Sequence, residues 1–139
     1  DEPYLTIENK PVTLNDIEHR ILRPIWQDHR LHYVLNCASI GCPNLSQTAY
    51  RATSIAQQMA DAQIAFLQHP RAISFTDRGE LQLTSLFDWY LADFAPDVYG
   101  LLAYLGVQRP DLAADLAAMA SNADAKINYV YDWDLNVVD

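Results

Sequence analysis

The clearest structural signal in the sequence is a β-hairpin at residues 72–84, AISFTDRGELQLT. Apolar and polar side chains alternate in both halves of this stretch, which is the two-residue period of a strand with one buried face. Residues 77–79, Asp-Arg-Gly, supply the turn, because glycine adopts positive φ without steric cost. The pattern therefore predicts an antiparallel pair of strands in the middle of the chain.

Helical periodicity is found on both sides of this hairpin. We expect the first helix to run from Leu14 to Arg23, where Pro24 stops it. Thr13 is its predicted N-cap. Apolar residues three and four apart predict further helices at residues 55–68, 85–94, 98–106 and 110–120, the third of which should end at Gly106.

Three short extended segments complete the pattern. They are residues 4–12, with a turn at Asn9 and Lys10, residues 31–36 and residues 126–133. Strands and helices do not alternate strictly, so the sequence favours an α+β fold, in which a small, mainly antiparallel sheet packs with about five helices. The length of 139 residues fits a single domain over residues 1–139.

Composition argues against nucleic acid and against a membrane span. The formal net charge is −9, and such a surface repels phosphate backbones, so nucleic acid is not expected as a partner. No apolar run approaches the roughly 18 residues that cross a bilayer. The chain begins at Asp1 without an initiator methionine, from which we expect a processed or shortened chain whose targeting signal is already gone.

The stretch LNCASIGCPNL, residues 35–45, holds both cysteines of the chain, Cys37 and Cys42. A cysteine nucleophile needs a base within hydrogen-bond reach, and His32 is the nearest histidine in the sequence. If residues 31–36 form a strand, His32 and Cys37 lie on opposite faces. A dyad of the two would then need a bend at Asn36.

Metal binding and a disulfide are the other two chemistries open to this stretch. His29, His32 and the two cysteines could supply zinc ligands, but their spacing does not match a zinc knuckle, and two histidines three apart in a strand point to opposite faces. No metal and no cofactor are therefore expected. A disulfide needs Cα atoms within about 7 Å, against roughly 17 Å when the segment is extended. Ser39 and Gly41 make the required chain reversal easy, and only an oxidising compartment would keep the bridge.

Residues 87–94, FDWYLADF, combine aromatic and acidic side chains. Aromatic residues at helical spacing usually pack in the core, although tryptophan and tyrosine also line binding surfaces. Asp88, Asp93 and Asp97 are expected to form a solvated face rather than a site.

Four segments resemble successive landmarks of one family, the domain-of-unknown-function family DUF547: LNDIEHRILRP, RLHYVLNCASIGCPNL, SLFDWYLADF and YVYDWDLN. Its bacterial members are often exported or lipid-anchored, so the resemblance implies a periplasmic location. The family domain usually begins with helices that carry an Asn-Ala-Tyr-Asn-like stretch, so this chain resembles the C-terminal part of a larger domain. The positions on the family's pattern are His32, Cys37, Ser39, Cys42, Pro43 and Asp132, whereas Asp134 stands where serine is expected.

Two functional hypotheses follow. The leading one is an exported, non-catalytic domain that binds a small molecule or a protein, with a structural Cys37–Cys42 disulfide. Asn36, Ser39 and Asp132 are its candidate binding residues. The competing one is a cysteine-dependent hydrolase or acyl transferase of papain-like or transglutaminase-like type, with Cys37 as nucleophile and His32 as base. Self-association, or association with a missing N-terminal segment, is expected to cover an exposed apolar face.

Overall fold

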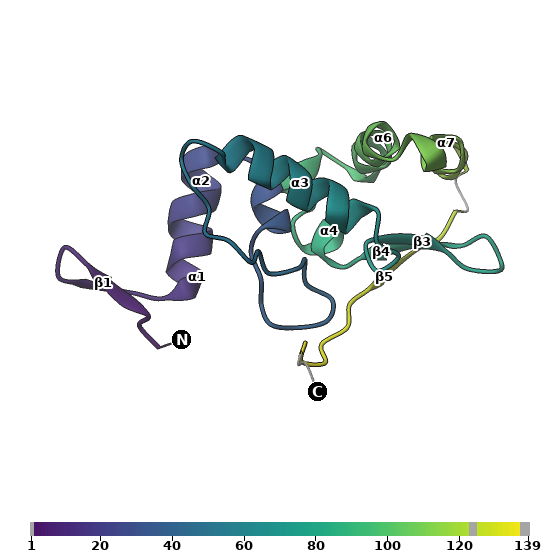
Figure 1. Cartoon of the computed structure of the whole chain (residues 1–139). Coiled ribbons are helices and arrows are strands. Elements are labelled where there is room, and N and C mark those ends of the chain that lie inside the picture. The colour runs from purple at the N-terminus through teal and green to yellow at the C-terminus, as the bar shows by residue number, and fades with distance from the viewer. Residues whose placement is uncertain (1, 123–124, 137–139) are drawn as a thin grey trace.

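The computed structural model describes residues 2–122 and 125–136 of the chain (Figure 1). An N-terminal hairpin is followed by helices and by a small sheet that carries helices to its side (Figure 1). The elements, in chain order, are β1 (Leu5–Ile7), β2 (Lys10–Val12), α1 (Leu14–Asp16), the π-helical η1 (Ile17–Leu22), α2 (Arg23–Trp26), the 3₁₀-helical η2 (His29–Tyr33), α3 (Ile55–Leu67), β3 (Ile73–Phe75), β4 (Leu81–Thr84), α4 (Leu86–Trp89), α5 (Leu91–Phe94), α6 (Val98–Gln108), η3 (Pro110–Leu112), α7 (Ala113–Ser121) and β5 (Ile127–Val130).

The predicted hairpin at residues 72–84 is confirmed and forms two strands of the main sheet. Strands β3 and β4 pair antiparallel, with Ile73 opposite Leu83, and Gly79 in the turn has φ 75°. Strand β5 adds parallel to β4 on the other side, which gives the order β3-β4-β5. Together with the antiparallel β1–β2 pair, this arrangement confirms the α+β fold with mostly antiparallel pairing.

The hydrophobic core lies between this sheet and the helices α3, α4, α6 and α7. Its buried members come from the sheet, from these helices and, through Tyr33, from η2, and they include Tyr33, Phe66, Leu67, Leu81, Leu83, Phe87, Leu101, Leu105 and Leu116. Each of these side chains is almost completely removed from water, and each contributes on the order of 1.5–3 kcal/mol of transfer free energy. Among the described residues, no helix is long and apolar enough to span a membrane.

The first helix begins as predicted and ends later than predicted. Thr13 accepts a hydrogen bond from the Asp16 backbone amide at 3.0 Å, which confirms the N-cap. The helix, however, does not stop at Pro24 but continues to Trp26. The N–H of Arg23 donates to the carbonyl of Glu18, five residues back, so a wide π turn precedes the proline. Pro24 then sits in the first turn of α2, where a missing N–H costs little.

Residues 31–36 do not form the predicted strand, and this correction matters for the site. Residues His29–Tyr33 form a 3₁₀ helix, capped by the Asp28 side chain, which accepts a hydrogen bond from the Arg30 amide at 3.0 Å. Burial of Leu31, His32 and Tyr33 favours this turn over the strand propensity of the segment. The argument that His32 and Cys37 lie on opposite strand faces therefore does not apply.

Two further helix boundaries differ from expectation. The helix predicted at residues 85–94 is divided into α4 and α5 at Tyr90, whose φ of −117° and ψ of 25° are not helical. Helix α6 passes Gly106 and ends at Gln108, because buried leucines on its inner face hold the helical turn. Helix α3 and strand β5 lie within their expected ranges, whereas α7 ends at Ser121, just beyond its expected range. The turn of the N-terminal pair lies at Glu8 and Asn9 rather than at Asn9 and Lys10, because Lys10 begins β2.

Candidate functional site

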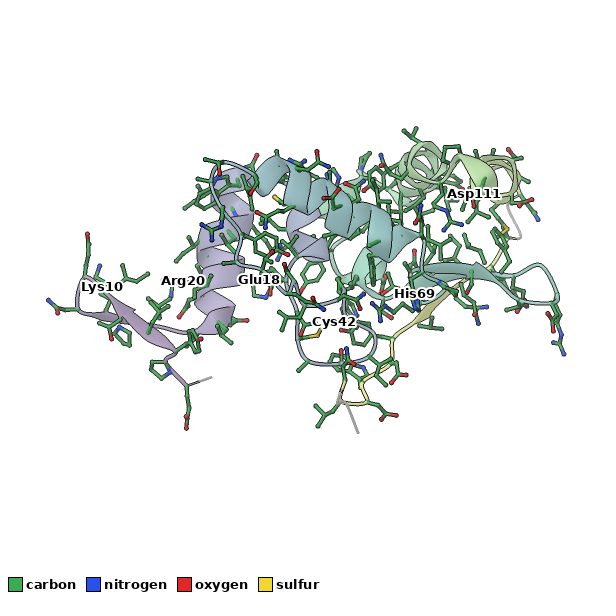
Figure 2. The ribbon with its side chains drawn as sticks, viewed as in Figure 1. Lys10, Glu18, Arg20, Cys42, His69 and Asp111 are labelled. Atoms are coloured by element: carbon green, nitrogen blue, oxygen red, sulfur yellow. A yellow bond between two sulfur atoms is a disulfide. The ribbon has the colours of Figure 1, made fainter. Side chains whose placement is uncertain are left out.

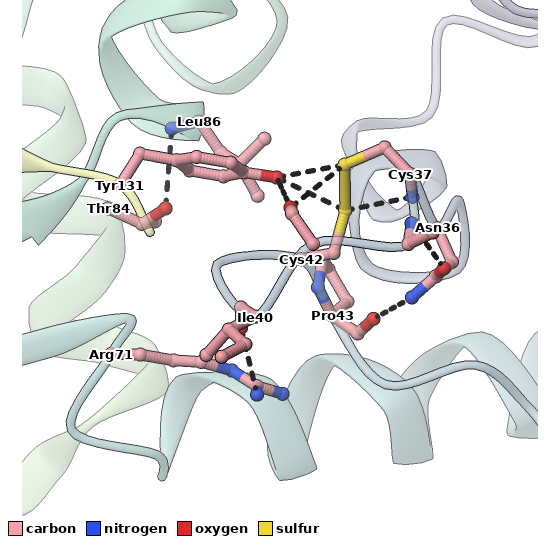
Figure 3. The surroundings of a disulfide bond; sticks show 11 residues. Asn36, Cys37, Ile40, Cys42, Pro43, Arg71, Thr84, Leu86 and Tyr131 are labelled. Carbon is pink, nitrogen blue, oxygen red and sulfur yellow. Dashed lines mark hydrogen bonds between the residues drawn. A yellow bond between two sulfur atoms is a disulfide. The ribbon is translucent and has the colours of Figure 1, made fainter. Parts of the chain in front are cut away.

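The two cysteines form a disulfide that closes the loop at residues 37–42 (Figure 3). Their Cα atoms are 6.2 Å apart, so the chain reverses as a bridge requires. Ala38 accommodates the reversal with a positive φ of 62°. Asn36 holds the base of the loop, because its side-chain amide donates to the carbonyl of Pro43 at 2.8 Å and its oxygen accepts from the Ala38 amide at 2.8 Å.

The chain that follows β5 returns to this loop and fixes its outer edge. The amide of Ile40 donates to the carbonyl of Asp134 at 2.8 Å, and the amide of Gly41 donates to that of Asp132 at 2.9 Å. A Cβ atom at Gly41 would lie 2.9 Å from the Asp132 nitrogen, so only glycine fits here. Asp132, a candidate binding residue, thus contributes its backbone to the structure of the loop.

The hydroxyl of Tyr131 contacts both sulfur atoms of the disulfide (Figure 3). It lies 2.9 Å from the Cys37 sulfur and 3.1 Å from the Cys42 sulfur. It also shares a hydrogen bond of 2.8 Å with the hydroxyl of Ser39, which is buried. The hydroxyl of Ser39, a predicted binding residue, therefore contacts the Cys37 sulfur and the Tyr131 hydroxyl.

His32 belongs to a charged and aromatic cluster beside the disulfide loop. Its Nε2 lies 2.7 Å from Oδ2 of Asp93, and the Arg23 guanidinium donates to the same oxygen at 2.6 Å. The ring of Tyr90 stacks on His32 with centroids 4.1 Å apart, and Arg23 lies over the same tyrosine at 4.7 Å. Asp93, which the sequence pattern assigned to a solvated face, therefore joins three elements through one carboxylate.

Electrostatics in this cluster hold His32 neutral and Asp93 ionised. The Arg23 guanidinium, followed by His32, lowers the pKa of the Asp93 carboxyl. Burial lowers the pKa of His32, and this outweighs the opposing effect of Asp93. Burial outweighs the effect of Asp93 on the pKa of His32 for two reasons. The His32 side chain is only 3% exposed, and Arg23 already compensates the Asp93 charge.

We expect the free energy of unfolding to fall as the pH drops from 7 toward 5. The pKa of folded His32 lies below its ordinary value of 6.5, so the unfolded chain binds this proton first. The stabilisation is complete above pH 6.5 and is lost as the pH falls below it. Burial also lowers the pKa of His29, so this residue acts in the same direction. Each histidine contributes at most about 1.4 kcal/mol per pH unit.

Urea denaturation between pH 7.5 and 5 measures this effect. A His32→Gln variant should show a smaller loss of stability on acidification, whatever its stability at pH 7.5. If the wild-type protein became more stable on acidification, the Asp93 charge rather than burial would determine the pKa of His32.

A cavity of 190 Å³ lies between the disulfide loop and this cluster. Glu18, at the His32 side, and Cys42, at the loop side, both line it (Figure 2). Of the candidate residues from the sequence, it brings together His32, Asn36, Cys37 and Cys42, whereas Ser39 and Asp132 do not line it. Among the described residues, its lining consists of Glu18, His32, Leu35, Asn36, Cys37, Cys42, Pro43, Leu86, Trp89, Tyr90, Tyr131 and Trp133.

An aromatic wall along this cavity was not predicted from the sequence. It consists of Trp89, Tyr131 and Trp133, whose ring centroids lie 4.7–5.6 Å from one another. Trp89 comes from the end of α4, and the other two follow β5. The pattern FDWYLADF gave a partial signal, since tryptophan and tyrosine also line binding surfaces. The pairing with the C-terminal segment had no sequence signal.

Three other hollows lie close to this site, and one of them shares Tyr131 and Trp133 with it and is also lined by Arg71. A polar one, lined by His19, Arg23 and Asp93 among others, lies on the far side of the cluster. An apolar groove of 580 Å³ lies between η2 and the start of α3 and contains Trp26 and Met59. The predicted self-association through an apolar face stays a prediction. No cluster of three or more potential metal ligands occurs among the described residues.

Comparison with known proteins gives one match. No curated protein and no solved structure matches the chain. A family model described as "Protein of unknown function, DUF547" matches residues 1–67, a span that includes Cys37, Cys42 and His32. The resemblance found in the sequence is thereby confirmed: residues 1–67 of this chain match the DUF547 family of unknown function.

Proposed function

We propose that the protein is an exported, non-catalytic domain that binds a small ligand, or a side chain of a partner protein, in the cavity beside the Cys37–Cys42 loop. The observation that carries the proposal is the construction of the cavity. A disulfide forms one wall and the Trp89, Tyr131 and Trp133 rings form another. A concave site with aromatic walls and a few polar groups is the usual form of a ligand site.

Contacts within the protein hold the disulfide wall of the cavity in place. Tyr131 contacts both sulfurs, and the amide of Gly41 bonds the loop to the C-terminal segment. A site whose walls are fixed in advance loses little conformational entropy on binding. The disulfide therefore supports affinity by holding shape, while its sulfurs, joined to one another, offer no thiolate nucleophile.

The same disulfide supports the proposed location. Disulfides persist in oxidising compartments such as the bacterial periplasm and are rare where thioredoxin and glutathione keep thiols reduced. A bridge that closes a loop of this kind in a 139-residue chain is consistent with an exported protein. We therefore place the proposed function in the periplasm or outside the cell.

One observation favours a second function, a thiol-dependent hydrolase or acyl transferase. His32 and Cys37 line the same cavity, and Asp93 holds Nε2 of the histidine at 2.7 Å. A neutral ring that donates Nε2–H to Asp93 leaves Nδ1 unprotonated, which is the tautomer of a general base oriented by a carboxylate. This function requires reduction of the disulfide, and it is the alternative that the experiments must separate.

A fragment screen followed by ¹H–¹⁵N NMR tests the binding function. We expect neutral and charged fragments of fewer than about ten heavy atoms to shift the indole N–H signals of Trp89 and Trp133, because both rings line the cavity. Trp26, in the apolar groove, provides a third indole signal that reports a different site. Hits that move Trp26 alone, or no hits at all, would contradict the proposal.

A further inference from the structure

We infer that the cavity beside the Cys37–Cys42 loop selects a small organic cation, such as an alkylated ammonium group, over neutral and anionic ligands of the same size. The inference rests on the binding function proposed above and names the ligand class of that same site. Three features of the described residues carry it: an exposed aromatic wall, one carboxylate, and lining residues without lysine or arginine.

The aromatic wall offers open ring surface at the cavity mouth. Trp89 is 46% exposed and Trp133 is 68% exposed, and the Tyr131 ring lies 4.9 Å from the first and 4.7 Å from the second. The face of an indole ring carries negative charge density, so a cation within about 6 Å of the centroid is attracted to it. A neutral ligand of the same shape gains only contact area.

The charge on the described lining residues has one sign. Glu18 supplies a carboxylate. The described residues that line the cavity include no lysine and no arginine. The nearest guanidinium in the cluster, Arg23, lines the polar hollow instead and is paired with Asp93 at 2.6 Å. Glu18 would therefore repel an anionic ligand, and the described lining residues offer that ligand no lysine or arginine in return.

His32 does not add a positive charge to the residues that line the cavity. Its side chain is only 3% exposed, and it stacks on Tyr90 with centroids 4.1 Å apart. Such burial disfavours the charged form of the imidazole, so at neutral pH the ring adds no positive charge to the cavity. Among the described lining residues Glu18 then supplies the charge, and the net charge of −9 on the whole chain has the same sign.

The size of the cavity sets the size of the cation. A volume of 190 Å³ corresponds to roughly six water volumes. An ammonium group with three or four methyl substituents fills such a space. A calcium or magnesium ion would need several oxygen ligands, whereas the described lining residues include one carboxylate, that of Glu18.

Choline and its neutral isostere 3,3-dimethyl-1-butanol test the inference. We expect choline to shift the Trp89 and Trp133 indole signals with a millimolar Kd, and the alcohol to bind at least about tenfold more weakly, since the cation–π gain is worth about 1.4 kcal/mol. Acetate should cause no shift. The Trp26 signal should not move with any of the three probes.

Matched variants complete the test. Trp133→Ala should weaken choline binding at least fivefold and Trp133→Phe should restore part of it, while Glu18→Gln should weaken it about threefold. Asp77→Asn, in the β3–β4 turn, removes the same charge elsewhere and should change nothing. Choline and the alcohol binding equally would overturn the inference but leave the binding function. If no fragment binds at the cavity, both proposals are wrong.

Discussion

An Asp93→Ala variant will unfold with a free energy about 2–3 kcal/mol lower than that of the wild-type protein. The physical reason is that one oxygen of this carboxylate accepts from both Arg23, at 2.6 Å, and His32, at 2.7 Å. Its removal leaves a guanidinium and a buried imidazole without their shared partner. The expected loss lies below that for a fully buried pair, because the Asp93 side chain is 28% exposed.

Urea denaturation monitored by circular dichroism at pH 7.5 measures this loss. Asp93→Asn keeps an acceptor oxygen but not the charge, so it should fall between the alanine variant and wild type. Asp88→Ala is the matched control, since Asp88 is exposed and lies in the same acidic segment, and it should cost less than about 0.5 kcal/mol. An Asp93→Ala variant as stable as this control would show that the His32–Asp93–Arg23 contacts do not stabilise the fold.

The features that sequence could predict depend on neighbours along the chain. The hairpin at residues 72–84 depends on alternation and on Gly79, and the first cap depends on Thr13 and Asp16, three residues apart. The closed cysteine loop also belongs to this group, because Cys37 and Cys42 lie within reach once the chain reverses. Local chemistry of this kind is readable without a structure.

The features that sequence missed depend on contacts between distant segments. His32 lies in a 3₁₀ helix because its side chain is buried against Tyr90 and Asp93, and the latter is 61 positions away. The Tyr131 hydroxyl reaches the Cys37 sulfur across 94 positions. Neither contact has a periodicity that a local pattern could carry, so the cavity could be predicted only in part, through His32, Asn36 and the two cysteines.

This division explains why the sequence argued against a His32–Cys37 pairing that the structure permits. The strand assumption placed the two residues on opposite faces, whereas the observed turn lets both line one cavity. The hypothesis of a structural disulfide and the hypothesis of a thiol enzyme now make opposite predictions about the redox state of Cys37. The decisive evidence therefore comes from the cysteines themselves.

Replacing both cysteines by serine should lower the free energy of unfolding by about 2–3 kcal/mol. Opening a six-residue loop costs about 2 kcal/mol in the chain-entropy model. The Tyr131 hydroxyl loses both sulfur contacts as well. For a chain of 139 residues this corresponds to a fall in Tm of roughly 6–10 °C, which differential scanning calorimetry measures.

The same variant separates the two functions. Under the binding function, the Cys37→Ser/Cys42→Ser protein should show weaker fragment binding at Trp89 and Trp133, because the loop wall is no longer held, while the apolar groove at Trp26 is unaffected. Thiol titration of the unreduced, unfolded wild type should find no free thiol. Two free thiols, one of them reacting rapidly with iodoacetamide in the folded protein, would contradict the structural disulfide. They would instead identify Cys37 as a nucleophile with His32, oriented by Asp93, as its base.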